Sequence, residues 1–473
     1  MTKLVLCNHW LFPVSTFHFG LASLAAYIKE THPQVSVKII EGENIFEEII
    51  VAKPDIVGFT CDTVSYLPTV ELAKKIRKTL DIPLIVGGVH VTAMPKIFDP
   101  VFQIGVIGEG EVTLSELLTI FEKYNCFPNR LIRKVKGIVF RDKGKVILTK
   151  KRELVKNIDR LPYPARELVP MNEVYLKNQV NLFGVSKMAA IMSSRGCPYK
   201  CVFCGSPVQW GGVRFHSAEY VVKEIEFLLT KYGIDGIIFW DDFFISPKER
   251  LIKMADLIRK KGLNKKITFF GYARANLINE DICLILQKMN VKRLIFGLES
   301  GSEKILDFLK EKTVKVEDNK RALLLCRKYK ISTSSGFIVG TPGETVCDLQ
   351  KTYQFMKKYP LDNSYIYILT PYPGTKIWNL ALRYGLISNS MDFGRLFVQF
   401  PPPSIFDYFR KEKKNILEGR IFLNIEYQTD KKYLKLIFKM HKMAHFQNML
   451  FYLKNIFADP KLLTKLFIRE VPS

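Results

Sequence analysis

The chain has 473 residues, of which 48% are hydrophobic and 25% charged, the balance of a globular protein. This length is enough for two or three domains, each with its own core. The net charge of +25 is unusual. It suits phosphates, nucleic acid or an anionic membrane surface, although lysines spread over solvated faces would give the same total.

The pattern of apolar residues predicts neither a signal peptide nor a membrane-spanning helix. No apolar run reaches the roughly 18 residues that span a bilayer, and the start of the chain is too short an apolar run for a signal peptide. The 9 cysteines lack the paired spacing of a disulfide framework. The sequence therefore predicts a cytoplasmic protein, with any membrane contact peripheral.

Residues 1–130 are expected to form a doubly wound, flavodoxin-like parallel α/β domain, because short apolar runs alternate with amphipathic stretches. Strands are expected at Lys3–Leu6, Val35–Ile40, Ile56–Thr60, Leu84–Val86 and Val101–Ile107, and helices at Leu21–Thr31, Leu67–Leu80 and Leu114–Tyr124.

The turns at the carboxyl ends of these strands are rich in glycine. Parallel sheets bind ligands at this edge, and glycine lets the backbone approach a bulky or phosphate-bearing ligand closely. The candidate contacts are Gly20, Thr60, Gly87, Gly88, Gly108, Glu109, Gly110 and Glu111.

Residues 131–185 read as a connector. Lys136–Thr149 has the pattern of a β-hairpin turned by Asp142-Lys-Gly144, and the prolines that follow block regular structure. Asp159 and Arg160, in this stretch, are expected to pack or cap rather than to catalyse.

From residue 186 to 390 the βα rhythm resumes with longer repeats, and six such units suggest a partial (β/α)6 barrel. Chemistry in α/β barrels gathers at the carboxyl ends of the strands. The six strands are expected at Met188–Met192, Gly236–Trp240, Ile267–Gly271, Arg293–Gly297, Ser335–Val339 and Ser364–Leu369, with a helix at Ser217–Tyr232 among those between them.

Three cysteines follow the first of these strands at C-x3-C-x2-C spacing: Cys197, Cys201 and Cys204. A [4Fe–4S] cluster normally takes one thiolate per iron, so three thiolates would leave one iron open. A structural zinc site usually adds a second pair of ligands at short spacing, whereas the next cysteine is Cys283. The spacing favours a cluster over zinc or chance.

This cysteine loop resembles that of the radical S-adenosylmethionine (SAM) superfamily. There the open iron chelates SAM, and an electron from the cluster cleaves it to a 5′-deoxyadenosyl radical that abstracts hydrogen from the substrate. The resemblance implies a [4Fe–4S] cluster, SAM and an external reductant such as flavodoxin or ferredoxin, on the partial barrel characteristic of the superfamily.

The order of the N-terminal turns is similar to that of the cobalamin-binding domain that precedes many radical SAM domains. The Asp-x-His-x-x-Gly motif of other cobalamin folds is absent from the sequence. The resemblance therefore implies cobalamin bound base-off without a protein histidine. His18 and His90 are open as alternatives but read more simply as ordinary loop histidines, and a degenerate domain that binds no cobalamin also stays open.

Polar residues at the barrel's strand ends suit the groups of SAM. The candidates are Asp241 and Asp242 for the ammonium, with a helix N-cap as the competing role of Asp242, Arg274 for the carboxylate, Glu299 and Ser300 for the ribose, and Gly340 on the adenine side. Glu344 falls one residue late for the family's pattern, so its role is open. Tyr372 faces the substrate or belongs to a rigid turn.

The tail, residues 391–473, is basic and expected to be mainly helical. Tyr433–Phe467 interleaves apolar residues with lysines, the pattern of a basic amphipathic helix pair. Such a pair suits an anionic membrane surface or a lid that closes the barrel with its lysines in solvent. Cys283, Cys326 and Cys347 are interpreted as core thiols.

Taken together, the resemblance implies a radical SAM enzyme that methylates an unactivated carbon or phosphorus of a small-molecule or lipid-like substrate. The alternative is radical oxidation or cyclisation, as in the anaerobic magnesium-protoporphyrin ester cyclases that the layout is similar to. A non-catalytic cluster or SAM sensor is a third reading, although no nucleic-acid-binding motif supports a nucleic-acid partner.

Overall fold

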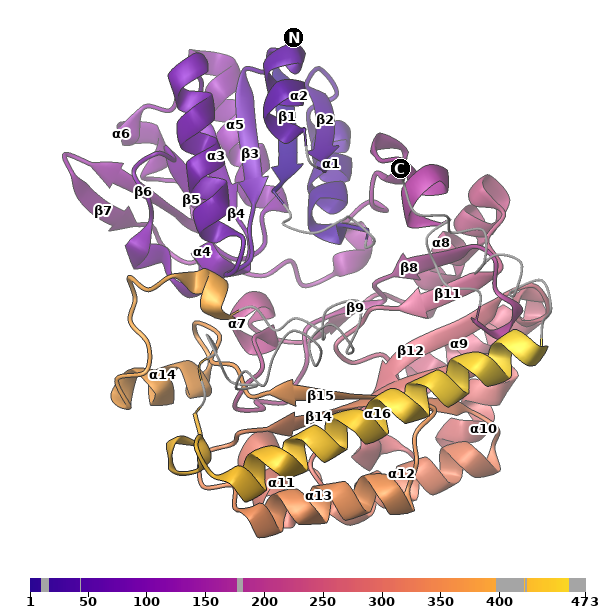
Figure 1. The fold of residues 1–473 in the computed structure, drawn as a ribbon. Coiled ribbons are helices and arrows are strands. Elements are labelled where there is room, and N and C mark those ends of the chain that lie inside the picture. Colours follow the sequence, from indigo (N-terminus) through magenta and orange to yellow (C-terminus); the bar gives the residue numbers. More distant parts are fainter. Residues whose placement is uncertain (10–16, 43, 177–181, 397–420, 422, 459–473) are drawn as a thin grey trace, which may run out of the picture.

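The computed structural model describes residues 1–9, 17–42, 44–176, 182–396, 421 and 423–458. Two α/β units follow one another along the chain, each built on its own sheet (Figure 1). The indigo and violet unit contains the seven-stranded sheet, and the pink to orange unit contains the six-stranded one.

The first sheet has the strand order β2-β1-β3-β4-β5-β6-β7, and its first five strands are parallel. Helices cover both faces, so strands such as β1, with the sequence KLVLCN, are short and buried almost throughout. The bounds are β1 Lys3–Asn8, α1 Phe19–Thr31, β2 Ser36–Glu41, α2 Ile45–Ala52, β3 Ile56–Thr60, α3 Tyr66–Thr79, β4 Leu84–Gly87, α4 Val89–Ala93, β5 Ile104–Val106 and α5 Glu111–Tyr124. The predicted doubly wound fold is confirmed.

Two features of this unit were not expected from the sequence. The helices α2 and α4 are only 8 and 5 residues long, too short to show a helical repeat. The hairpin of β6 Ile138–Asp142 and β7 Lys145–Leu148 does form, but it extends the first sheet, because β6 pairs with β5 in antiparallel register.

The second sheet is entirely parallel, with the order β15-β14-β13-β12-β11-β8. Each strand pairs with the next along the chain, which is the order of the predicted partial barrel. Its strands are β8 Met188–Ile191, β11 Gly236–Phe239, β12 Thr268–Ala273, β13 Val291–Glu299, β14 Ser332–Val339 and β15 Asn363–Ile368, and its helices include α8 Ala218–Tyr232, α9 Lys248–Lys260, α10 Glu280–Lys288, α11 Glu303–Lys310, α12 Val316–Lys328 and α13 Val346–Lys358.

The tail contributes the last outer helix of this barrel. The 28-residue helix α16 Lys431–Ala458 packs along β15 and α13 (Figure 1) and buries Tyr433, Ile437 and Met440. At its far end the Asn448 amide bonds the backbone N–H and carbonyl of Ser364 at 2.7 and 2.9 Å.

This arrangement corrects the prediction for the tail. A single helix along the outer side of the sheet takes the place of a lid, with Lys435, Lys439 and Lys442 exposed. The remainder of the predicted helix pair, to Phe467, lies outside the described residues. In the part of the chain that the structure describes, no helix is both long and apolar enough to cross a membrane.

Two buried hydrophobic clusters each contain residues of both units. Val57 and Val86 of the first sheet belong to the same buried cluster as Leu309 and Trp378 of the second unit. Between the sheets, α4 contacts α7 Ser206–Trp210, a short helix that follows the cysteine loop. The carboxyl ends of both sheets therefore face a common space.

Candidate active site

A cavity of about 320 Å³ lies between the two units. Its walls include all eight residues predicted as cobalamin contacts: Gly20, Thr60, Gly87, Gly88, Gly108, Glu109, Gly110 and Glu111. The opposite wall contains Met192, Arg195 and Trp210, which flank the cysteine loop in the sequence. The cavity thus joins the glycine turns of one unit to the residues that flank the cysteine loop of the other, and the three cysteines themselves are not among its lining residues.

The backbone conformation and surroundings of Gly88 require a glycine at this position. Its φ of +102° is rarely adopted by other residues, and a Cβ there would lie 2.3 Å from the carbonyl oxygen of Cys61. The Thr92 hydroxyl bonds the Gly88 carbonyl and accepts the Gly108 N–H, both at 2.9 Å. The Gly88 and Gly108 turns are therefore fixed to each other, and at these two positions the cavity wall is backbone.

The two histidines considered as cobalt ligands are placed differently. His18 lines the cavity, but its Nδ1 accepts the Leu21 N–H at 3.3 Å, which leaves the ring proton on Nε2. Burial lowers its pKa to about 4. His90 is not among the lining residues: it stacks on Tyr66 at 4.0 Å and meets Phe393 at 4.8 Å. Neither ring turns a free lone pair into the cavity.

The cysteine loop is closed at its base by two short strands. β9 Ser194–Arg195 pairs in antiparallel register with β10 Arg214–Phe215, and all three cysteines lie between them. Gly196, with φ +85°, lets the chain cross here, because a Cβ would lie 2.2 Å from the Gly212 carbonyl oxygen.

The three thiols are partly buried on one loop. Burial raises the pKa of Cys197, and it raises that of Cys204 to about 11. Donors already point at two sulfurs: the Ser206 N–H at Cys204 Sγ and Arg274 Nη1 at Cys201 Sγ, each at 3.4 Å. These are the hydrogen bonds that tune a sulfur-bound cluster, so the loop fits one.

Within the described ranges, no three His, Cys, Asp or Glu side chains are grouped so as to hold one metal ion. The ligands of a [4Fe–4S] cluster each bind a separate iron. They therefore surround a larger volume than the ligands of a single ion do.

The two aspartates after β11 have different surroundings. Asp241 is buried and accepts the hydroxyls of Ser193 and Ser194 at 2.9 and 2.5 Å, and burial raises its pKa. Asp242 is exposed and accepts the Ser206 hydroxyl at 2.6 Å. The alternative N-cap role of Asp242 is wrong for α9, because Pro247 precedes that helix.

Arg274 contacts the cysteine loop directly, whereas Glu299 is linked to it only through Lys310. The Arg274 guanidinium stacks on the Tyr199 ring at 3.6 Å, besides its bond to Cys201. Glu299, with φ +60°, forms a buried ion pair with Lys310 at 2.8 Å, and the Lys310 ammonium lies 5.4 Å from the Phe203 ring. A non-glycine residue at such φ is uncommon and gathers at functional sites.

Two other SAM candidates are engaged elsewhere. Ser300 is fully buried, and its hydroxyl pairs with that of Thr352 on α13 at 3.0 Å. Gly340, with φ +82°, donates its N–H to Glu344 at 2.9 Å. Ser300 thus holds the barrel to its outer helix, while Gly340 can meet a ligand only through its backbone.

The structure also bears on the predictions for Asp159 and for the cysteines outside the loop. Asp159 accepts the Ser217 N–H at 3.0 Å just before α8, the packing and capping role expected of it. Cys283 and Cys326 are buried as predicted, whereas Cys347 is exposed, which corrects its assignment to the core. It lies in the first turn of α13.

The sequence interpretation assigned no role to Arg195 or Arg214. Arg195 bonds Glu109 and Glu111 at 2.9 and 2.7 Å, and Arg214 also bonds Glu109. The signal that was available is a pair of arginines flanking the cysteine loop and a pair of glutamates in one glycine turn. The two pairs have opposite charges, but the sequence does not show that the fold brings them into contact.

Known protein families match both units. The model of the radical SAM superfamily matches residues 191–356, and that of the B12 binding domain matches residues 13–118. An uncharacterized methyltransferase of Pyrococcus horikoshii is 33% identical over 435 residues, which cover 89% of this chain and 90% of that protein. The anaerobic magnesium-protoporphyrin IX monomethyl ester cyclase of Cereibacter sphaeroides is 28% identical over 365 residues, 76% of this chain but only 58% of the cyclase.

Among solved structures, the radical SAM methyltransferase TsrM from Kitasatospora setae has the same fold. It superimposes with a TM-score of 0.67 at 18% identity, over 84% of this chain and 80% of TsrM. The cobalamin-dependent SAM radical enzyme OxsB gives a TM-score of 0.63 at 21% identity, over 75% of this chain and 52% of OxsB.

Proposed function

The chain belongs to the radical SAM superfamily, in the branch that carries a B12-binding domain, and we propose that it is a cobalamin-dependent methyltransferase of a small molecule. The observation that carries the proposal is the single cavity whose walls are the glycine turns on one side and the flanks of the cysteine loop on the other. Methyl transfer to a substrate radical needs the methyl donor and the radical source close together.

Each group has residues that fit it. Cys197, Cys201 and Cys204 would hold a [4Fe–4S] cluster, and the glycine turns would hold the corrin. When bound, the cluster and SAM supply a hydrogen-abstracting radical, and cobalamin supplies the methyl group. The chain's own residues bind these groups, orient them and exclude water from the space between them.

For SAM we propose the residues that gather at the cysteine loop. Arg274 suits the carboxylate and Glu299 the ribose, and Asp242 is an exposed acid bonded to Ser206, whose N–H donates to Cys204. Asp241 instead positions the loop base through Ser193 and Ser194. The reaction also needs an external reductant, for which a flavodoxin or ferredoxin is proposed.

The test is anaerobic reconstitution of the full chain with iron, sulfide and cobalamin, followed by addition of reductant and SAM. We expect retained cobalamin and formation of both 5′-deoxyadenosine and S-adenosylhomocysteine. The 28% identity to the ester cyclase favours oxidation or cyclisation as the second candidate. Deoxyadenosine without S-adenosylhomocysteine would favour that reading instead.

A further inference from the structure

The base of the cysteine loop carries two arginines side by side. Arg195 of β9 lies directly opposite Arg214 of β10 in the antiparallel ladder. Like charges in this position repel each other. The loop base is therefore stable only if an acidic partner lies across it.

That partner comes from the other unit. Glu109, in the turn between β5 and α5, accepts from Arg195 at 2.9 Å and from both Nη atoms of Arg214 at 2.8 and 2.7 Å. Glu111 accepts the remaining Nη of Arg195 at 2.7 Å. The four side chains are only 9–11% exposed, so water screens them little.

The charges of these four side chains balance, because two arginines face two glutamates. Burial alone would raise the pKa of Glu109, but the hydrogen bonds and charges of Arg214 and Arg195 outweigh it and lower the pKa. The carboxylate is therefore ionised, and the bidentate Arg214 pair fixes its orientation. Removing one partner would leave another charge buried and unpaired.

We infer that Glu109 is a positioning residue that clamps the cluster loop to the cobalamin turn and so couples the two cofactor sites. The inference rests on the proposed function, because it takes the cavity as the corrin site and the cysteines as the cluster site. Gly108 and Gly110, on either side of Glu109, line the cavity. A corrin that orders this turn would order the loop base through Glu109, and by linkage a loaded cluster would raise cobalamin affinity equally.

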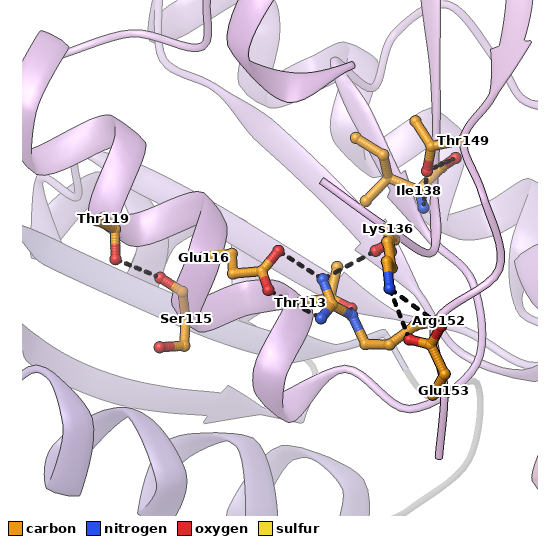
Figure 2. A network of polar contacts seen from close by, with 9 residues as sticks. All are labelled: Thr113, Ser115, Glu116, Thr119, Lys136, Ile138, Thr149, Arg152 and Glu153. Carbon is orange, nitrogen blue, oxygen red and sulfur yellow. Dashed lines mark hydrogen bonds and ion pairs between the residues drawn. The ribbon is translucent and has the colours of Figure 1, made fainter. Parts of the chain in front are cut away.

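Substitution of Arg214 tests the proposed coupling without changing a residue that lines the cavity. Arg195, Glu109 and Glu111 line the cavity, whereas Arg214 is not among its lining residues. A matched control is Arg152, which forms a bidentate pair with Glu116 of α5 at 2.9 and 2.6 Å (Figure 2). That pair lies wholly within the first unit and joins nothing to the cysteine loop.

The experiment measures the Kd of hydroxocobalamin for the full chain by absorbance, before and after cluster reconstitution. In the wild type we expect the cluster to tighten binding at least about fivefold, the lower range of typical coupling. In R214M the ratio of the Kd before reconstitution to the Kd after it should fall toward one. The EPR signal of the reduced cluster should also broaden. R152M should keep the wild-type ratio and signal.

The alternatives are distinguishable. Wild-type coupling in folded R214M, or loss of coupling in R152M as well, would overturn the clamp. If R214M does not fold, R214K is the substitute, because lysine keeps the charge but cannot form the bidentate pair. We expect R214K to give a Kd ratio below that of the wild type, and a wild-type ratio would contradict the inference. A wild type that binds neither cluster nor cobalamin would refute the proposed function, whereas one that binds both without coupling would refute the clamp alone.

Discussion

The Tyr433 hydroxyl, on the last described helix, donates a hydrogen bond to the carboxylate of Glu344 at the carboxyl end of β14, 89 residues earlier. The Gly340 N–H donates to both groups, at 2.9 Å to Glu344 Oε2 and 3.1 Å to the Tyr433 oxygen. The Asn424 amide donates to the Glu344 carbonyl at 2.8 Å. The tail is thus fastened to the strand end that carries the predicted adenine side of the SAM site.

The Glu344 carboxyl should make stability depend on pH. Burial raises its pKa from 4.5 to about 7, although hydrogen bonds from Tyr433 and Gly340 oppose the rise. Because the folded state binds this proton more tightly, the stabilisation is complete below pH 4.5 and is lost as pH rises through 7. The full change is about 3 kcal/mol.

The measurement is the free energy of urea unfolding of wild type and E344Q between pH 5 and pH 8, at intervals of about half a unit. The difference between them should shift in favour of E344Q as pH rises, because the amide does not titrate. Y433F removes a donor to the carboxylate and should move the transition to higher pH. A pH-independent difference would contradict the assignment.

Replacing Cys197, Cys201 or Cys204 by Ala should abolish the visible absorbance of the reconstituted cluster and with it SAM cleavage. Each change removes one thiolate from a set that has no spare member on the loop. The control is C347A, since Cys347 is exposed on α13. Full iron content in the triple variant would refute the cluster assignment.

The sequence was sufficient for the fold because strand runs and glycine turns are local signals. All eight glycine-turn candidates line one cavity, since parallel strands bring their carboxyl ends to one edge. Contacts between segments that are distant in the chain could not be predicted from the sequence. Nothing local tells that Ser300 faces α13, that Glu109 meets two arginines, or that α16 completes the barrel.

The E299Q variant should lose both stability and SAM affinity. Lys310 is paired with Glu299 at 2.8 Å, and both side chains are less than 10% exposed, so the amide would leave a buried ammonium without its counter-charge. A loss on the order of 3 kcal/mol is expected from such a break. If Glu299 also meets the ribose, the Kd of SAM should rise as well.

Urea unfolding and calorimetric titration with SAM measure the two effects separately. E303Q is the matched control, because Glu303 pairs with Lys315 at 3.1 Å at the surface, where such pairs contribute about 1 kcal/mol or less. A stability loss in E299Q with unchanged SAM affinity would limit Glu299 to a structural role.

Substituting Gly88 should abolish cobalamin binding, because Gly88 lines the cavity that we propose for the corrin. In G88A the new methyl group would meet the Cys61 backbone at 2.3 Å, and the residue would also hold a φ of +102°. The turn must then move, and Thr92 ties the same turn to Gly108. We expect cobalamin to be lost on gel filtration, while cluster absorbance is largely kept because the cysteine loop belongs to the other unit.

The control for backbone strain alone is G144A. Gly144, in the β6–β7 hairpin, has φ +78°, and no atom lies within 4 Å of the position that an added methyl group would take. Its substitution should cost about 1 kcal/mol of stability from strain and leave cobalamin retention unchanged. Because both variants carry the strain and only G88A carries the clash, equal cobalamin retention in the two would place the corrin elsewhere than against this turn.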